Sequence, residues 1–201
     1  MFVLLMIKAE VFEKIRSKIL NQLSDNLSKD LLYHGVHHTI DVEKEAERIA
    51  IGEKITSQED LLLLKIACLY HDSGFLFTYQ NHEAAGCNLA MKELPAFGLN
   101  QKQLDIICGM IMATKIPQTP RTILEEIICD ADLDYFGRDD FFLIAHTLFL
   151  ELKARHFVTT EYDWNKIQIK FFKQHHYFTD TTKKLRAKQK QHYFEMIEAM
   201  V

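Results

Sequence analysis

The stretch LLLLKIACLYHDSG, residues 61–74, decides the fold of this chain. Its first ten residues are almost all apolar, and a capping pattern, S-x-x-D at 57–60, precedes them. A helix that is apolar around nearly its whole circumference lies at the centre of a helical protein. The run ends on His71 and Asp72, which brings a polar pair to the interior. We expect Gly74 to end this helix in a left-handed conformation.

The rest of the chain has the same helical character. Of its 201 residues, 48% are apolar, 26% are charged and only three are prolines, which favours one all-α domain over residues 1–201. Helical periodicity continues into the last third of the chain, and it predicts helices at about 8–23, 36–54, 81–94, 100–113, 121–135 and 139–155. The net charge of −4 argues against a general affinity for nucleic acid, and the basic run at 183–190 is expected to be a solvated helix face.

The four cysteines and the first residues indicate a cytoplasmic protein. The cysteines form no C-x-x-C pair, and each lies in or beside an apolar run, as buried reduced thiols do. The start, MFVLLMIKAEVF, has no positively charged region before its apolar run, and that run is far shorter than the ~20 residues of a membrane span. We expect this segment to pack on the core, with no membrane association, and the apolar ends would suit a homodimer contact.

Three histidines lie in the segment YHGVHHTIDV, residues 33–42. The apolar stripe of the following helix, extended backward in steps of four from Val42, passes through His38 and His34, whereas His37 faces elsewhere. His38 is therefore the best candidate for an inward role. For His38 taken alone, a core histidine bonded to the backbone is the alternative.

Two further places carry acids between apolar residues. His71 and Asp72 are costly to bury without a partner, and a metal cation would offset that cost; an ordinary aspartate near a helix end is the alternative. In IICDADLDYF, residues 127–136, Asp132 and Asp134 flank the apolar stripe more closely than Asp130 does. For Asp130 or Asp134 taken singly, a solvated face is the alternative.

Together these segments resemble the HD superfamily of metal-dependent phosphohydrolases, whose pattern is H…HD…D on an all-α core. The resemblance covers about residues 30–140, and residues of about 140–201 are expected to form further helices packed on that core. It implies that His38, His71, Asp72 and Asp132 hold a divalent metal ion.

Some members of the superfamily hold a second metal with two more histidines. His82, in YQNHEAAG, matches the first of these places, but the segment GMIMATK at 109–115 has no histidine for the second. We therefore expect one metal ion, with His82 free to contact substrate or water. Nitrogen and oxygen ligands suit Mn, Fe, Ni, Co or Zn, and also Mg if water fills most positions.

The resemblance implies hydrolysis of a phosphoester, as a phosphomonoesterase or phosphodiesterase, with a nucleotide or another small phosphorylated molecule as substrate and a metal-activated water as nucleophile. Asp72 is expected to orient or deprotonate this water. His34 is expected to protonate the leaving oxygen, the role of a histidine in this place in the related cyclic-nucleotide phosphodiesterases. Lys115 and Arg138 are candidates for binding the substrate phosphate, with a solvated surface role as the alternative for each.

Two rival functions use the same residues differently. A regulatory HD domain would keep its metal and bind a nucleotide-like ligand with little or no turnover. A purely structural helical protein would bind no stoichiometric metal. His175 and His176, in FFKQHHYF, are expected to be structural or to line the mouth of the pocket, and Trp164 is expected in the core or an interface.

Overall fold

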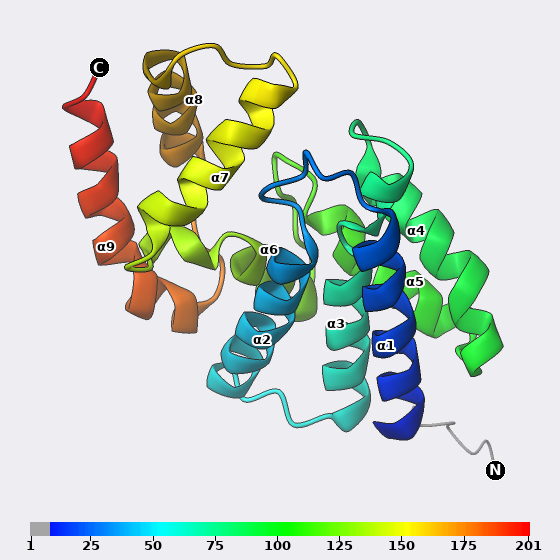
Figure 1. The fold of residues 1–201 in the computed structure, drawn as a ribbon. Helices are drawn as coiled ribbons and strands as arrows, with labels where there is room; N and C mark the ends of the chain where they lie inside the picture. The colour runs from blue at the N-terminus through cyan, green and yellow to red at the C-terminus, as the bar shows by residue number, and fades with distance from the viewer. Residues whose placement is uncertain (1–8) are drawn as a thin grey trace.

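The computed structural model describes residues 9–201, and within them the protein is entirely helical, with no β-strand, which confirms the predicted all-α class (Figure 1). Short 3-10 helices (η) separate some of the α-helices. In order, the elements are α1 (Ala9–Asn26), α2 (Val36–Gly52), α3 (Gln58–Tyr70), η1 (Ser73–Leu76), α4 (His82–Glu93), η2 (Leu94–Phe97), α5 (Gln101–Ala113), α6 (Ile123–Asp132), η3 (Asp134–Gly137), α7 (Phe141–Ala154), α8 (Glu161–Gln174) and α9 (Asp180–Glu198).

Helix α3 lies at the centre of the first hydrophobic core, as its composition predicts. Ser57 caps it by accepting a hydrogen bond from the backbone N–H of Asp60 at 3.2 Å. From Leu63 onward nearly every side chain of the helix is buried, against α1, α2 and α5. The helix thus delivers the residues that follow it to the middle of the molecule.

The expectation that Gly74 adopts a left-handed conformation is wrong. Among the described glycines only Gly98 has a positive φ, of 88°. Gly74 lies instead in η1, where the start of α4 passes directly against it, and a Cβ atom here would be 1.8 Å from the carbonyl oxygen of His82. A glycine is required at this position because two backbone segments meet there.

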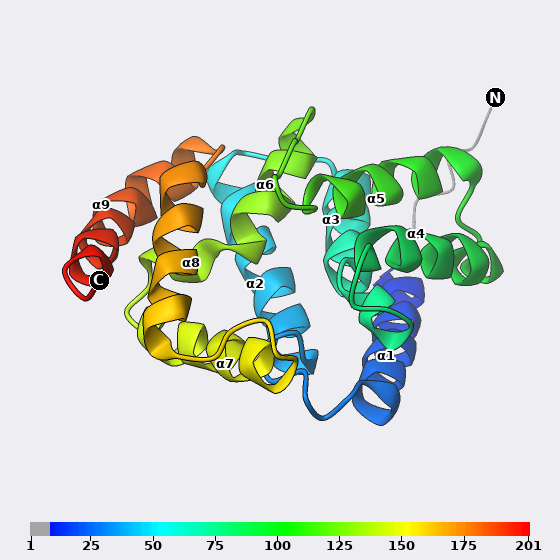
Figure 2. The same cartoon turned by 90° about the horizontal axis from the view of Figure 1, so that it is seen from above.

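Side chains of η3, α7, α8 and α9 form a second hydrophobic cluster. Tyr33, from the segment before α2, belongs to it as well. In both ribbon views α2 and α6 run between the two groups of helices, with α1, α3, α4 and α5 on one side and α7, α8 and α9 on the other (Figure 2). Trp164 and Phe149 pack in this second cluster. One domain over the whole chain stays a prediction, as does the packing of residues 1–8, which lie outside the described part.

The acidic segment at 130–134 departs from the prediction because α6 ends at Asp132 and not near residue 135. Asp130 and Asp134 are both fully buried, so the solvated face considered for them is wrong. Asp130 accepts hydrogen bonds from the backbone N–H groups of Phe178 and Thr179, both at 2.8 Å, just before α9. Asp134 accepts from two arginines, as described below, so both acids attach α9 to the rest of the molecule.

Two simpler expectations concern the cysteines and the membrane. All four cysteines are free, and three of them are buried: Cys68, Cys87 and Cys129. None of the helices found between residues 9 and 201 is both long and apolar enough to cross a bilayer.

Candidate metal centre and adjoining cavity

The ends of α2, α3 and α6 meet at one point. His38 lies in the first turn of α2, His71 and Asp72 directly follow α3, and Asp132 is the last residue of α6. A residue at a helix end can present its side chain beyond the helix, so side chains from three directions reach the same space. The four residues that sequence patterns single out as metal ligands are thus brought together, although up to 94 positions separate them along the chain.

The donor atoms of these side chains form a compact group. His38 Nε2 lies 3.1 Å from Asp132 Oδ1, and His71 Nε2 lies 3.2 Å from Asp72 Oδ2. The crossed distances are 3.5 Å from His38 Nε2 to Asp72 Oδ2 and 3.6 Å from His71 Nε2 to Asp132 Oδ1. Ligand atoms of His38, His71 and Asp132 all lie within 4.8 Å of one another, and Asp72 adjoins both imidazoles.

His71 has the hydrogen bonding of a metal ligand. Its Nδ1 lies 2.7 Å from the carbonyl oxygen of Cys68, so this nitrogen carries the proton and donates it. In a neutral imidazole Nε2 then presents a lone pair. Both His71 Nε2 and Asp72 Oδ2 are buried and make no hydrogen bond within the described chain. Buried polar atoms are rarely left in this state, and a divalent cation fits the requirement of both.

The ionisation of the two acids in the centre also favours a bound cation. Burial opposes ionisation of Asp72, yet the neighbouring His71, His34 and His38 hold the pKa of its carboxyl well below the usual range. Burial raises the pKa of Asp132, but its hydrogen bond to His38 and the adjoining His71 ring together lower it to about 2. Two buried carboxylates are therefore ionised side by side. They need positive charge between them, as protonated imidazoles or as a cation.

A second polar unit, beside the centre, joins His34 to α7. His34 Nδ1 lies 2.6 Å from Glu151 Oε1. The same carboxylate accepts hydrogen bonds from the backbone N–H groups of Tyr33 and His34, at 2.9 and 3.1 Å, and from the hydroxyl of Tyr79 at 3.0 Å. Burial alone would lower the pKa of His34, but its hydrogen bond to Glu151 and the nearby carboxylates raise it. The ring is thus held in one orientation and favoured in its protonated form.

Sequence patterns do not predict Glu151, which lies 117 positions after His34. A weak signal exists, because this acid continues an apolar stripe of α7 through Ile144 and Leu148 and is fully buried. A charged residue on the buried face of a helix needs a partner elsewhere in the fold.

A cavity of about 280 Å³ opens onto the centre. Asp72, Asp132, His34 and His82 contribute to its lining, together with many side chains of η3, α7 and α8. Pockets that bind small molecules are of about this size or larger.

Comparison with known proteins adds the family. The family model of the HD domain matches residues 35–134, a range that contains His38, His71, Asp72 and Asp132. The chain belongs to the HD domain family. No curated protein matches its sequence.

Two solved structures are similar to this HD-domain protein over most of its length. One is a structural genomics target from Lactobacillus plantarum, with 19% sequence identity and a TM-score of 0.67, covering 97% of this chain and 98% of that one. The other is described as a predicted HD superfamily hydrolase from an uncultured Thermotogales bacterium, with 24% identity and a TM-score of 0.60, covering 92% of this chain and 90% of that one. At these identities the likeness shows a shared fold that includes the C-terminal helices.

His82, the first residue of α4, faces the centre of this HD domain. Its Nδ1 lies 3.2 Å from the carbonyl oxygen of Tyr79, and its ring stacks on Phe75 with centroids 3.9 Å apart. Its Nε2 lies 3.5 Å from Asp72 Oδ1 and 3.6 Å from Glu83 Oε1. These distances are long for direct hydrogen bonds, so Nε2 can bond instead to a water or a substrate atom beside it.

The two candidate cations for substrate phosphate are engaged elsewhere. Lys115 Nζ donates to Asn81 Oδ1 at 2.8 Å, and Arg138 bonds to Asp41 and Asp140, each at 2.6 Å. Neither side chain lines the cavity at the centre. His175 and His176 line other cavities, near α9.

Proposed function

We propose that this HD domain is a metal-dependent phosphohydrolase that acts on a small phosphorylated compound. The observation that supports it best is the convergence of His38, His71, Asp72 and Asp132 beside a cavity. Two buried donor atoms of this group have no hydrogen-bond partner among residues 9–201. Family membership supports the same reading.

The geometry supports a proposed set of metal ligands. His38, His71 and Asp132 would hold a divalent ion, and Asp72 Oδ2, adjoining both imidazoles, would complete the set. A cation in this position supplies Lewis acidity, since it offsets negative charge on a phosphoryl group and favours ionisation of water. Cys68 fixes the orientation of the His71 ring through its carbonyl oxygen.

His34 would donate a proton to the leaving oxygen. Its Nδ1 is bonded to Glu151, so the proton that it can give up is the one on Nε2. After the transfer a neutral ring with its proton on Nδ1 remains, which is the tautomer that Glu151 stabilises. His34 is thus the proposed general acid, and Glu151 is a positioning residue that acts through it.

Asp72 and His82 would bind and orient the attacking water. Asp72 Oδ2 adjoins the two imidazole ligands, whereas its Oδ1 faces His82 Nε2 at 3.5 Å. A water beside these two atoms can donate to the carboxylate and be oriented toward the phosphorus atom, opposite the leaving group. His82 therefore keeps the role expected of it, as a contact for water or substrate.

The test measures both the metal content of the protein and its turnover of phosphoesters. Protein purified without added metal is analysed for bound elements, then reloaded with Mn²⁺, Ni²⁺ or Zn²⁺ and assayed on generic phosphomonoesters and phosphodiesters. We expect one ion per chain and metal-dependent turnover, both lost in His71→Ala and Asp72→Ala. His176→Ala, which removes an exposed histidine outside the centre, is the matched control.

Two results would contradict the proposal. Equal metal content in the parent protein and in Asp72→Ala would show that the ligand assignment is wrong. Stoichiometric metal and tight nucleotide binding without turnover of any ester would instead favour the regulatory HD domain.

A further inference from the structure

The cavity at the metal centre has two chemically different parts. The segments around α2, α3, α4 and α6 supply its ionisable groups, among them His34, Asp72, His82 and Asp132. Helices η3, α7 and α8 supply a wall that is almost wholly apolar and aromatic, formed by Phe136, Leu148, Leu152, Trp164, Phe171 and Phe172. Trp164, Phe136 and Phe172 are each more than nine-tenths buried, so this wall is part of the packed core.

The lining contains no lysine and no arginine from the described residues 9–201. Its charged members other than histidine are Asp72, Glu83 and Asp132, all negative. The nearby cations are held elsewhere: Lys115 by Asn81, and Arg155 over the ring of Tyr79 at 4.3 Å from its centroid. A metal ion with His34 and His82 can balance one phosphoryl group, but a second phosphate would enter an apolar space beside three acids with no partner.

Besides the phenol of Tyr135, one polar side chain from η3, α7 and α8 lies in this wall. Gln168, on α8, is buried, and its Nε2 donates to Asn165 Oδ1 at 3.2 Å. Its carbonyl oxygen can accept a hydrogen bond from a ligand, and its second N–H can donate one. A compact organic group with few polar contacts matches this wall and the cavity volume of about 280 Å³.

Resting on the phosphohydrolase function proposed above, we infer the substrate class: a monophosphate ester of a compact, largely apolar alcohol, with nucleoside polyphosphates and bisphosphates rejected. The phosphoryl group occupies the polar end, and the alcohol portion lies against Trp164, Phe171 and Phe172. Hydrolysis transfers the phosphoryl group to water and releases the alcohol, which takes its proton from His34.

Primary alkyl phosphates test this directly, because ethyl, butyl and hexyl phosphate have nearly the same leaving group and differ only in apolar length. We expect kcat/KM to rise by about fourfold for each methylene that is buried. Hexane-1,6-diyl bisphosphate should be used at least about tenfold less well than hexyl phosphate, because its second phosphate would lie unpaired against the wall. The Kd values of the matching alkylphosphonates, measured by calorimetry, give the same comparison without turnover.

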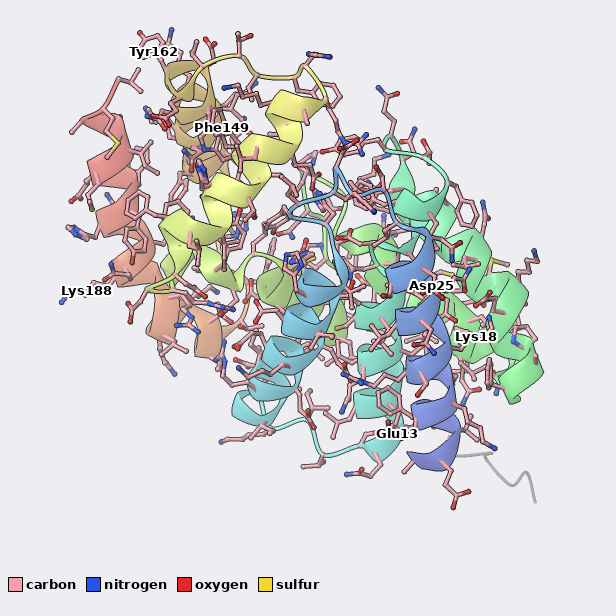
Figure 3. All side chains as sticks on the ribbon, viewed as in Figure 1. Glu13, Lys18, Asp25, Phe149, Tyr162 and Lys188 are labelled. Carbon is pink, nitrogen blue, oxygen red and sulfur yellow. The ribbon has the colours of Figure 1, made fainter. Side chains whose placement is uncertain are left out.

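Variants of α8 test whether this helix causes the dependence of kcat/KM on chain length. Trp164→Ala should flatten the dependence on chain length, and Ile167→Ser on the same wall serves if the tryptophan variant does not fold. Tyr162→Ala is the control, since this aromatic residue lies on the outside of the molecule near the start of α8 (Figure 3). Gln168→Lys, which adds a cation to the wall, should raise the use of the bisphosphate relative to hexyl phosphate.

The outcomes separate the two proposals. Equal kcat/KM and equal phosphonate Kd for short and long chains, or a bisphosphate used as well as hexyl phosphate, would overturn the substrate class while the phosphohydrolase stands. No turnover of any ester by the metal-loaded protein would overturn the phosphohydrolase, and the substrate class with it.

Discussion

Glu151 is fully buried and is the acceptor of four hydrogen bonds, from Tyr33, Tyr79 and both the ring and the backbone of His34. A buried carboxylate is tolerated in a protein when its oxygens are satisfied in this way. The bonds tie the segment before α2 to α7. They also decide which nitrogen of His34 faces the cavity and therefore which proton can be transferred.

Replacing Glu151 with glutamine tests the link between this carboxylate and the proton on His34. The amide oxygen can still accept from the backbone N–H groups of Tyr33 and His34, but the negative charge that raises the pKa of His34 is lost. Because the general acid must be protonated, we expect the alkaline limb of the kcat profile to move to lower pH. At pH 8 kcat should fall by on the order of tenfold.

The measurement is a pH–rate profile on an alkyl phosphate with the metal at saturation. Glu198→Gln, a change to an exposed acid paired with Lys173, is the control and should leave the profile in place. An unchanged alkaline limb in Glu151→Gln would mean that His34 is not the acid. A merely structural role for Glu151 would lower activity equally at every pH.

Single residues differ in how far sequence can predict them. His38 follows from the apolar stripe of its own helix, and the resemblance agrees, because both depend on local spacing. Glu151 depends on contacts between segments more than a hundred positions apart, and spacing within one helix does not contain that information. The sequence predicted Lys115 and Arg138 as cations but not their partners, since Asn81 and Asp41 are brought to them by the fold.

At the scale of elements, the junction between η1 and α4 fixes both Asp72 and His82. Gly74 lets the two backbones approach so closely that no side chain fits between them. This contact holds the carboxylate that follows α3 against the histidine that begins α4.

Gly74→Ala should therefore reduce stability and disturb the centre. Overpacking a closed backbone contact costs about 1–3 kcal/mol or more of the free energy of unfolding, which urea denaturation measures. Gly109→Ala is the matched control, because a Cβ there meets only the end of the flexible Glu125 side chain, at 3.1 Å, and alanine favours the helix by about 0.5–1 kcal/mol. Equal stability of the two variants would show that the contact at Gly74 can relax.

Helix positions could be predicted from sequence to within a few residues, but one boundary mattered more than the others. A helix continued to residue 135 would place Asp132 and Asp134 about 200° apart, one on each flank of the apolar stripe. The break after Asp132 instead turns Asp134 toward α9. No glycine or proline marks this break. Asp134 pairs with arginines of α2 and α9, and helical periodicity does not predict such a tertiary contact.

At the scale of the whole molecule, Asp134 connects the two groups of helices. It accepts from Arg48 on α2 at 2.8 Å and from Arg186 on α9, also at 2.8 Å. Its carboxylate is buried, while both guanidinium groups reach solvent in part. Together with Asp130, it attaches α9 to the segment that carries the metal ligand Asp132.

We therefore expect the change from aspartate to asparagine to have different effects at Asp134 and at Asp132. Asp134→Asn should lower the free energy of unfolding by about 2 kcal/mol, less than the ~3–5 kcal/mol of fully buried pairs because the arginines are partly solvated. It should leave metal content unchanged. Asp132→Asn should abolish metal binding with a smaller loss of stability. Denaturant unfolding of the metal-free proteins and elemental analysis separate these results, and metal loss in Asp134→Asn alone would contradict them.

The division of the cavity wall between α7 and α8 has a consequence for how this protein can diversify. Helix α7 supplies apolar wall residues and also Glu151, so changes that reshape it risk the orientation of His34. Helix α8 supplies wall residues and carries none of the residues proposed to hold the metal ion or to transfer a proton. New specificities can therefore arise by drift or by directed evolution in α8 while the reaction chemistry is inherited unchanged.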